Sequence, residues 1–455
     1  MPTTAGRALI DEGIADGSVD TVVVAFPDMY GRPVGKRVTA DFFSAHVADH
    51  GIEACEYLLA VDVDMTPMPG YRFASWDTGY GDVVCRPDYE TTRRIPWLPG
   101  TALVIADLTD EAGEPVEVSP RQMLRRQLDR AAARGLLVDA ATELEFFLFR
   151  DSYEEAAAAA WKDLTPHTST IEDYQLLQTA REEYILRRIR NEMLGAGIPI
   201  EFSKGEAGRG QHEVNVTFAG ALETADRHLV FKNGIKEIAA QEGRAATFMA
   251  KWTMEDVGSS CHLHVSLRDA ESGESVMADP SHHHGLSSVA RRFLAGQLLA
   301  AQELAWCAAP TLNSYRRYVP GSWAPTAAVW GEDNRTCGFR VVGQGASRRV
   351  ESRIPGADVN PYIVIAAAIA GGLYGIDYEY DLPDPYPGNA YEATDVPRIP
   401  ATLVEAIEEL RASAVASQAF GPDVHQHLLN MAEQEWAASN RHVSDWELAR
   451  NFERI

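Results

Sequence analysis

The stretch "TELEFFLF" (residues 142–149) alternates charged and apolar side chains, as a half-buried β-strand does. Side chains two positions apart on a strand share a face, so Glu143 and Glu145 would point to one side and Leu144 and Phe146 to the other. The wet face of an antiparallel sheet shows the same alternation. The stretch therefore predicts a strand with two carboxylates on one face, and leaves open whether those carboxylates form a site.

The sequence around this strand divides into a β-rich unit and a longer mixed part. Residues 19–38, 81–88 and 101–108 favour short strands joined by turns. Ser119 and Pro120 have the N-cap and N1 chemistry of a helix that Gly135 ends. After it, strands alternate with segments suited to helices at 154–164, 183–194, 227–243, 288–309 and 360–376. We expect an α+β protein with domains at residues 1–112 and 113–455.

The composition excludes several classes of protein. The 455-residue chain carries a formal net charge of -25, which argues against nucleic acid or an anionic membrane as a partner. Its five cysteines show no metal-ligand spacing and fit a reducing compartment. The N-terminus has no signal-peptide apolar segment, and no apolar run is long enough to span a membrane. These features predict a cytoplasmic enzyme or binding protein.

Further carboxylates and two histidines are candidate metal ligands. "KGEAGRGQHEV" (204–214) places Glu206 and Glu213 on either side of a Gly-rich turn. "GSSCHLHVSL" (258–267) places His262 and His264 on one face of a strand, and Glu351 follows later in the chain. Imidazoles and carboxylates together bind divalent metals. Acidic loops and core histidines are also common without metal, so each motif alone is weak.

Arginines are the second unusual feature. We count six lysines among the 41 basic residues, and no lysine lies between residues 316 and 353, where seven arginines fall: Arg316, Arg317, Arg335, Arg340, Arg348, Arg349 and Arg353. A guanidinium fork matches carboxylate and phosphate, although a solvated face or a subunit interface would have the same composition. Carboxylates for Mg²⁺ and arginines for phosphate together predict phosphoryl transfer. Neither a P-loop nor a kinase Gly-rich loop is present in the sequence.

Taken in order, these motifs resemble the glutamine synthetase family over nearly the whole chain. "FPDMYGRPVGKRV" (26–38) and "GYGDVVCRPD" (79–88) are similar to its N-terminal β-grasp domain. The landmarks of its catalytic domain are matched by "TELEFFLF", "GEAGRGQHEV", "ATFMAKW", "GSSCHLHVSL", "NSYRRYVPG", "NRTCGFR", "RRVESRIPGADVNPY" and "DWELARNFERI". The resemblance implies a small β-grasp domain followed by a catalytic domain of antiparallel sheet and flanking helices. It also implies that ATP phosphorylates the γ-carboxylate of glutamate and that an amine attacks the γ-glutamyl phosphate.

The resemblance assigns roles residue by residue. Glu145, Glu206 and Glu213 match ligands of the metal nearer glutamate, and Glu143, His262 and Glu351 match ligands of the metal at the ATP phosphates. The implied ATP contacts are His264, Ser266, Phe218, Arg340 and Arg349. Gly258, Arg317 and Arg353 match glutamate-binding positions, and Arg335 matches the arginine that steadies the transferred phosphoryl group and contacts glutamate. The implied cofactors are two to three Mg²⁺ (or Mn²⁺) ions per site, with ATP as co-substrate, in a dodecamer of two hexameric rings.

The chain departs from the ammonia-using members at the nucleophile site. Trp323 stands where those members have a glutamate that helps bind ammonium and accepts its proton, and an indole cannot do so. Asp77 is out of register with their ammonium-binding aspartate, and Val257 replaces an asparagine. The resemblance is strongest to the actinobacterial branch that makes γ-glutamyl amides of polyamines, ethanolamine or other small amines. We therefore expect a glutamate–amine ligase of nitrogen metabolism, with Trp323 lining the amine pocket and Glu206 as one candidate proton acceptor.

Three other interpretations remain open at this point. The chain could be an ammonia-dependent glutamine synthetase, which would release phosphate rapidly with ammonium alone. It could be a non-catalytic structural relative, although that would leave the intact metal-ligand set without a purpose. A guanidino kinase shares the catalytic fold, and the matches at the glutamate-binding positions argue against it. The residues around Tyr391, "GNAYEATD" (388–395), differ from those around the tyrosine that is adenylylated in classical members.

Overall fold

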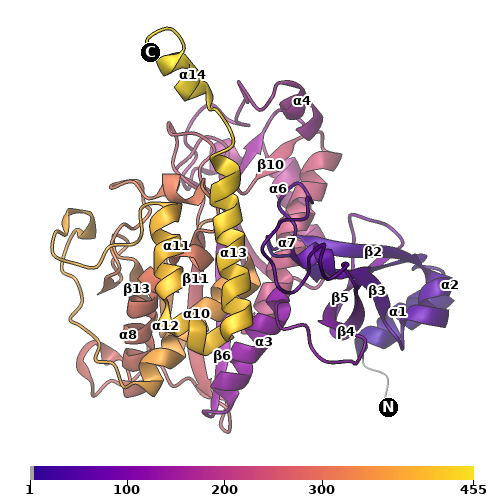
Figure 1. Cartoon of the computed structure of the whole chain (residues 1–455), viewed down its shortest axis with the longest axis horizontal. Coiled ribbons are helices and arrows are strands. Elements are labelled where there is room, and N and C mark those ends of the chain that lie inside the picture. The colour runs from indigo at the N-terminus through magenta and orange to yellow at the C-terminus, as the bar shows by residue number, and fades with distance from the viewer. Residues whose placement is uncertain (1–4) are drawn as a thin grey trace.

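The computed structural model describes residues 5–455, apart from the side chains of Gln178 and His283. Its N-terminal part is a five-stranded sheet in the order β2-β1-β5-β4-β3. The strands are β1 (Thr21–Pro27), β2 (Pro33–Thr39), β3 (Ile52–Cys55), β4 (Asp82–Arg94) and β5 (Thr101–Thr109). Helix α1 (Ala5–Ala15) and the short α2 (Ala40–Phe42) accompany them, and this unit lies to one side of the larger domain (Figure 1).

The larger domain is built on a second sheet, whose main path has the order β12-β13-β14-β11-β6-β8-β7. The long central strands β6 (Leu136–Phe149) and β11 (Cys261–Asp269) pair antiparallel, and β7 (Ile200–Gly205), β8 (Gln211–Val216) and β14 (Arg349–Ser352) continue the antiparallel pattern. Strand β12 (Trp330–Glu332) runs parallel to β13 (Phe339–Val342) at one edge. The short β9 (Ala219–Gly220) and β10 (Ala245–Thr247) also pair with β6. The predicted α+β architecture is confirmed.

Strand β6 has the two faces that its sequence predicts. Leu144 and Phe146 are buried in the main hydrophobic core. Glu143 and Glu145 lie on the opposite face and meet side chains of β11 and β8. Alternation along this strand therefore separates a core-forming face from a polar face, which carries the candidate site.

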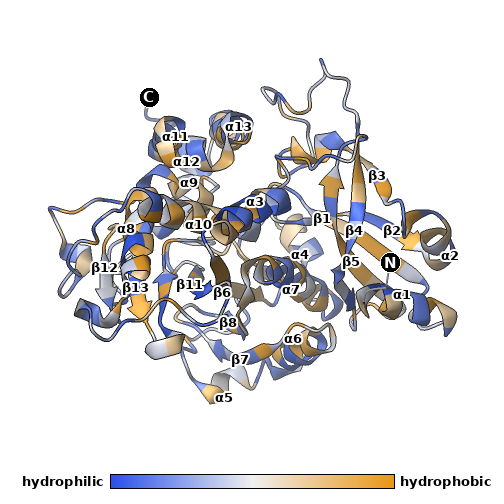
Figure 2. Ribbon diagram, turned by 90° about the horizontal axis from the view of Figure 1, so that it is seen from below, coloured by the Kyte–Doolittle hydropathy of each residue, from blue (hydrophilic) through white to orange (hydrophobic). Residues whose placement is uncertain are grey.

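Helices cover the core side of the sheet. Helix α3 (Pro120–Ala132) starts after the predicted N-cap Ser119, and α7 (Ala221–Gln241) packs against β6. Helix α10 (Pro361–Asp377) packs against both α3 and α8 (Ser288–Glu303), and the ribbon seen from below places α10 beside them (Figure 2). Backbones approach closely here, because a Cβ added at Gly296 would lie 2.2 Å from the carbonyl oxygen of Gly371.

The remaining helices complete the layer and the C-terminal end. These are α4 (Tyr153–Ala158), α5 (Leu176–Thr179), α6 (Glu183–Gly195), α9 (Ala305–Ala308), α11 (Leu403–Ala412), α12 (Ala414–Phe420), α13 (Pro422–Ser439) and α14 (Asp445–Asn451). The helix expected at 154–164 is shorter than predicted. It ends at Ala158, because Ala160 and Trp161 adopt positive φ angles that a right-handed helix does not contain. Helix α14 projects from the body of the molecule at the C-terminus (Figure 1).

A buried arginine joins the two parts of the molecule. Arg121 of α3 is 1% exposed and forms ion pairs with Asp88 and Asp107 of the N-terminal sheet and with Asp226 of α7. A buried charge is stable only when it is paired in this way. The domain boundary at residue 112 remains a prediction.

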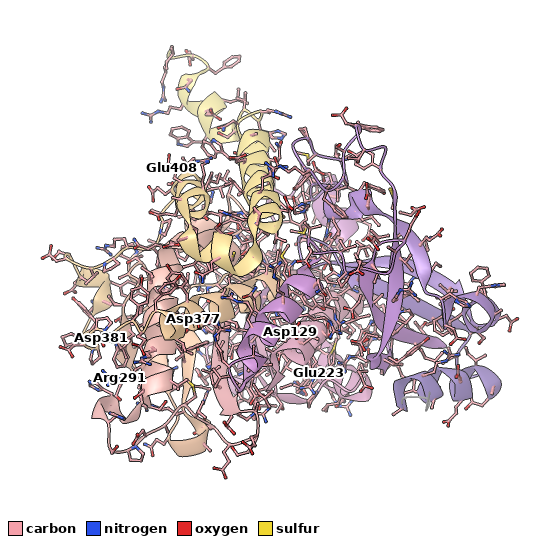
Figure 3. The ribbon with its side chains drawn as sticks, turned by 60° about the horizontal axis from the view of Figure 1, so that its bottom comes forward. Asp129, Glu223, Arg291, Asp377, Asp381 and Glu408 are labelled. Carbon is pink, nitrogen blue, oxygen red and sulfur yellow. The ribbon has the colours of Figure 1, made fainter. Side chains whose placement is uncertain are left out.

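The net negative charge is spread over the outside of the molecule. Exposed acidic side chains include Asp129 of α3, Asp377 of α10 and Glu408 of α11, which Figure 3 shows on different elements of the larger domain. Among residues 5–455, no helix is both long and apolar enough to cross a bilayer.

Candidate active site

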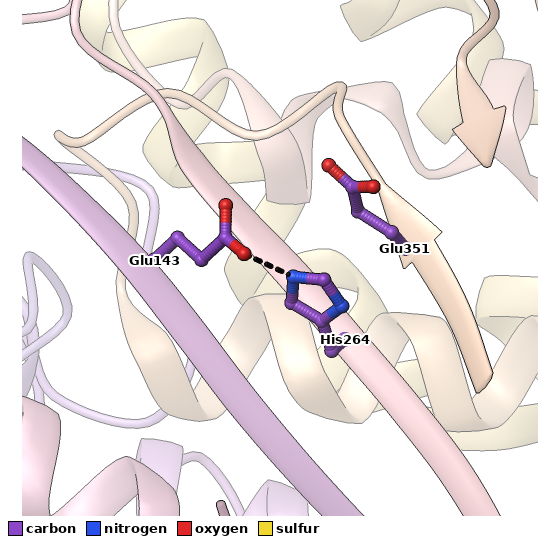
Figure 4. Close-up of side chains that lie close together, drawn as sticks. All are labelled: Glu143, His264 and Glu351. Carbon is purple, nitrogen blue, oxygen red and sulfur yellow. Dashed lines mark hydrogen bonds and ion pairs between the residues drawn. The ribbon is translucent and has the colours of Figure 1, made fainter. Parts of the chain in front are cut away.

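The first cluster of the site forms across three neighbouring strands. Strand pairing places Glu143 of β6 opposite His262 of β11, and His264 opposite Glu351 of β14. Glu143 Oε2 lies 3.1 Å from His262 Nδ1, and Glu143 Oε1 lies 2.8 Å from His264 Nε2. Ligand-type atoms of Glu143, His264 and Glu351 lie within 4.8 Å of one another (Figure 4). We call Glu143, His262, His264 and Glu351 the histidine cluster.

The carboxylates of the histidine cluster are held in their ionised forms. Burial would raise the pKa of Glu143, but hydrogen bonds from His262 and His264 lower it below the usual range. Burial likewise opposes ionisation of Glu351, and the charges of His262 and Arg353 outweigh it, so this pKa is also lowered. Arg353 Nη1 donates to Glu351 Oε1 at 2.6 Å. Burial, followed by the charge of Arg353, lowers the pKa of His262, which favours a neutral imidazole.

The second cluster lies further along the same face of the sheet. Glu145 of β6 is directly opposite Glu213 of β8, and Glu206 follows the end of β7. One oxygen of each of these three carboxylates lies within 4.8 Å of the others. The ammonium of Lys204 contacts Glu206 and lies 3.7 Å from Glu213. We call Glu145, Glu206 and Glu213 the carboxylate cluster.

Burial, with crowding of like charges, raises the pKa values of two members of the carboxylate cluster. Burial, and then the negative charge of Glu206, raises the pKa of Glu145 to about 7. Burial raises the pKa of Glu213 to about 9 in spite of Lys204, and the charges of Glu143 and Glu145 add to the effect. The pKa of Lys204 is itself raised, because Glu213 and Glu206 outweigh the cost of its burial. Lys204 alone therefore does not balance the negative charge that the three carboxylates would carry if all were ionised.

The donor chemistry of both clusters fits divalent metal ions. Oxygen-only ligands, as in the carboxylate cluster, suit Mg²⁺ or Mn²⁺, and a mixed imidazole–carboxylate set also binds such ions. The raised pKa values in the carboxylate cluster are the physical sign of that fit, because a divalent ion would replace the protons held there. The structure thus brings five of the six predicted metal ligands into two candidate metal groups. In the first of them His264, predicted as an ATP contact, takes the place of the predicted ligand His262, which contacts Glu143 instead.

A cavity of about 870 Å³ opens next to the histidine cluster. Four of the five predicted ATP contacts line it: Phe218, His264, Ser266 and Arg349. The ring of Phe218 is 62% exposed, and the Arg349 Nε donates to His264 Nδ1 at 3.1 Å. Arg340 lines an adjoining cavity instead, where it pairs with Glu351 at 2.8 Å and with Asp333.

Two of the predicted glutamate-binding residues, Gly258 and Arg317, lie beside the carboxylate cluster, whereas the Arg353 side chain pairs with Glu351 of the histidine cluster. Arg317 is 2% exposed, donates to the carbonyl oxygens of Arg353 and Ile354, and donates to Ser260 Oγ at 2.8 Å. A Cβ at Gly258 would lie 2.7 Å from Arg317 Cγ, so glycine is needed for this contact. Ser260 N donates to Glu145 Oε2 at 2.7 Å, which links the arginines to the carboxylates.

Two predicted site residues, Arg335 and Trp323, are exposed and lie outside both clusters. Arg335 is exposed on the turn between β12 and β13, where its charge acts on Asp333. No hydrogen bond among the described residues joins Arg335 to either cluster. Trp323 is 57% exposed and has φ 65°, an unusual backbone conformation for a bulky residue. The buried Tyr391 hydroxyl lies beside the backbone of Trp323 and within the field of Arg317 and Arg353.

Comparison with known proteins identifies the fold and the site together. The family model described as "Glutamine synthetase, catalytic domain" matches residues 117–451, about three quarters of the chain. The chain belongs to the glutamine synthetase family. The site described above accordingly lies within the matched catalytic domain of a glutamine synthetase family protein.

Relatives within the glutamine synthetase family include enzymes named for organic amines. A γ-glutamylethanolamide synthetase, GlnA4 of Streptomyces coelicolor, is 53% identical over 442 residues, which are 97% of this chain and 94% of the relative. A glutamate–isopropylamine ligase of Pseudomonas is 39% identical and covers 96% of each chain. The solved structure of a GmaS/ADP complex superposes with a TM-score of 0.85 at 27% identity and covers 98% of this chain and 99% of that one.

Three residues of the site were missed by sequence reasoning. Lys204 supplies a positive charge to the carboxylate cluster. Gln211 Nε2 lies 3.3 Å from Glu145 Oε2 and donates to Gly258 O at 3.0 Å, and Ser260 anchors Glu145. A signal for Lys204 was present, because it lies two positions before Glu206 and is one of few lysines. Nothing in the sequence indicated which backbone amide would meet Glu145.

Proposed function

We propose that this glutamine synthetase family protein is an ATP-dependent ligase that joins the γ-carboxylate of glutamate to a small organic amine. The observation that carries the proposal is the loop of residues 318–325, which presents an exposed indole and no carboxylate beside the glutamate-binding arginines. The named activities of the γ-glutamylethanolamide synthetase and the glutamate–isopropylamine ligase support it. Ethanolamine, short alkylamines and polyamines are the candidate amines.

The two clusters divide the work of the reaction. Bound divalent ions would supply charge neutralisation of the ATP phosphates and of the γ-carboxylate. The histidine cluster faces the large cavity, where Phe218 offers an aromatic face for adenine and Arg349 offers a cation for phosphate. The carboxylate cluster adjoins Arg317 and Arg353, whose side chains would fix glutamate so that its γ-carboxylate points toward the transferred phosphate.

The amine would reach the acyl phosphate past Trp323. An indole face binds CH₂ groups and attracts a cation, whereas ammonium is bound best by a carboxylate acceptor, which this loop lacks. We assign Glu206 as the acceptor of the proton that the amine loses on attack, since it is the least buried member of the carboxylate cluster. Arg335 is assigned to the phosphoryl group during transfer.

The finer aspects of the proposal concern metals, assembly and location. We propose two to three Mg²⁺ or Mn²⁺ ions per site and a cytoplasmic dodecamer of two hexameric rings. Exposed apolar side chains at Leu176, Leu177, Trp446 and Phe452 are suited to subunit contacts. Mass measurement of the purified protein by light scattering would give about twelve chains, and a monomer would refute this part of the proposal.

An amine panel tests the central proposal. Purified protein would receive ATP, Mg²⁺ and glutamate with ammonium, ethanolamine, isopropylamine, putrescine or spermidine supplied separately. We expect phosphate release and a γ-glutamyl amide of the corresponding mass with at least one organic amine. If ammonium alone supports turnover and the product is glutamine, the protein is an ammonia-dependent glutamine synthetase and the proposal is wrong.

A further inference from the structure

A third group of potential ligands lies on the other face of strand β8. Because side chains alternate along a strand, His212 points away from the side on which its neighbour Glu213 joins the carboxylate cluster. Glu172 and Glu182, from the segment before α6, meet His212 there. One ligand-type atom of each of these three residues lies within 4.8 Å of the others, and all three residues are 0% exposed.

Several buried polar atoms of this group have no hydrogen-bond partner. His212 Nε2 lies 2.8 Å from Glu182 Oε2, yet neither nitrogen of His212 has an aligned hydrogen-bond partner. Both oxygens of Glu172 are likewise without a hydrogen-bond donor. The nearby hydroxyl of Thr168 donates to the carbonyl oxygen of Thr170 instead. Buried polar atoms of this kind are expected to be paired, so their convergence on one point indicates a missing partner.

Two histidines, His167 and His212, contact Glu182, whereas no ion pair among the described residues reaches Glu172. His167 Nδ1 lies 2.8 Å from Glu182 Oε1, which fixes the rotation of that carboxylate. The carboxylates of Glu172 and Glu182 remain close to each other in a region without solvent. Two adjacent carboxylates can both be ionised there only if a cation lies between them, and otherwise they must share a proton.

We propose that Glu172, Glu182 and His212 form a buried binding site for a divalent transition-metal ion, separate from the catalytic site. One imidazole and two carboxylates, without a thiol, suit Zn²⁺ or Mn²⁺. His167 holds Glu182 in the orientation for binding, as partners of metal ligands commonly do. The ion would tie the segment of residues 166–182 to β8 and would thereby support the strand that carries Glu213.

The test is the metal content of the full-length protein. Protein loaded separately with Zn²⁺ or Mn²⁺ would be desalted and its bound metal counted by mass spectrometry. The Glu143→Ala/Glu145→Ala double background removes one ligand from each catalytic cluster, and in it we expect one tightly held ion per chain to remain. Glu172→Gln and His212→Asn should each lose that ion, whereas Glu154→Gln, an exposed change on α4, should keep it. The loading that gives the retained ion distinguishes Zn²⁺ from Mn²⁺.

Two results would overturn the proposal. One is a retained ion in Glu172→Gln equal to that in the unchanged protein. The other is no retained ion in the Glu143→Ala/Glu145→Ala background together with a higher melting temperature for Glu172→Gln, which would mean that the two carboxylates share a proton. Anomalous scattering at the metal edge from crystals of the unchanged protein needs no variant, and a peak between Glu172 and His212 is the expected result. Failure of the amine proposal would leave these measurements unaffected.

Discussion

The histidine cluster and the carboxylate cluster lie on one face of one sheet, yet their carboxylates are in opposite electrostatic states. Glu143 and Glu145 are two positions apart on β6. The pKa of Glu143 is lowered by two imidazoles, whereas the pKa of Glu145 is raised to about 7 by burial and by another carboxylate. Position along a single strand, rather than residue type, therefore decides which carboxylate is stabilised in its ionised form by neighbouring residues.

The difference between the carboxylate pKa values affects how the proposed ligase would bind its metal ions. The carboxylates of the histidine cluster are already ionised, and Arg340 and Arg353 form ion pairs with Glu351. This cluster can therefore bind a metal ion at any pH near neutrality. The carboxylate cluster must lose protons before it can bind one. Metal binding beside glutamate is therefore expected to depend on pH more steeply than metal binding beside the ATP phosphates.

The largest expected effect comes from removing one carboxylate from each cluster. Glu143→Gln and Glu145→Gln should each lower kcat/KM by about 10²- to 10³-fold, because each removes charge that orients a metal at the reacting groups. Steady-state kinetics should show the larger loss of ATP affinity for Glu143→Gln and the larger loss of glutamate affinity for Glu145→Gln. Glu154→Gln is the exposed control. Identical kinetic patterns for the two variants would contradict the division of work.

The pH dependence of metal binding is the second test. Glu145 and Glu213 have pKa values raised to about 7 and about 9, so the free protein holds protons at this cluster in neutral solution. Their release on metal binding should tighten Mn²⁺ binding by up to about a hundredfold per pH unit below pH 7, where two protons are displaced, and by up to about tenfold per unit from pH 7 to 9, where one is displaced. Titration calorimetry in buffers of different ionisation enthalpy would count the protons.

The histidine cluster is the internal control for that measurement. Its carboxylates have lowered pKa values, and the lowered pKa of His262 leaves this imidazole neutral in the same range. Metal binding in the Glu145→Gln variant, where the histidine cluster is intact, should therefore be nearly independent of pH above 6. A steep dependence in that variant would show that the contrast between the two clusters is wrong.

Replacing Trp323 tests the glutamate side of the site separately from the ATP side. Trp323→Ala should raise the KM for the amine about tenfold, which corresponds to the loss of ~1.4 kcal/mol of binding, and should leave the KM for ATP nearly unchanged. Val319→Ala changes another partly exposed apolar side chain of the same loop and serves as the control. Equal increases in both constants would assign Trp323 to packing of the loop.

The smallest expected effect concerns the cation within the carboxylate cluster. Lys204 contacts Glu206 and lies near Glu213 in the absence of metal, so its positive charge opposes that of an incoming ion. Lys204→Met should tighten Mn²⁺ binding by roughly three- to tenfold, because the remaining carboxylates repel one another more strongly. Lys36→Met, at an exposed position of β2, is the control. Weaker Mn²⁺ binding in Lys204→Met would mean that the lysine helps to build the site.

Local patterns predicted much of this molecule because they depend on neighbouring residues. Alternation placed Glu143 and Glu145 on one face, and capping chemistry placed the start of α3 at Ser119. Strand register could not be predicted, because the pairing of Glu143 with His262 joins positions far apart in the chain. The positive φ angles that end α4 early also left no signal in a run of alanines.

Prediction of the site residues was limited in the same way, because it also depends on contacts between distant parts of the chain. The family resemblance predicted the six metal ligands, and the structure gathers them into two clusters. Lys204 was missed because its position among the carboxylates depends on how β7 pairs with β8. Glu172 and Glu182 gave no signal, since only folding of residues 166–182 brings them to His212. The exposed position of Arg335 likewise could not be read from its motif.

The most direct measurement of the central claim is a competition between nucleophiles. Equal concentrations of ammonium and ethanolamine would be supplied with ATP, Mg²⁺ and glutamate, and the two products would be counted by mass. The account predicts that γ-glutamylethanolamide exceeds glutamine in the unchanged protein and that Trp323→Glu, which restores a carboxylate, shifts the ratio toward glutamine. Glutamine as the main product of the unchanged protein, with no shift in the variant, would contradict it.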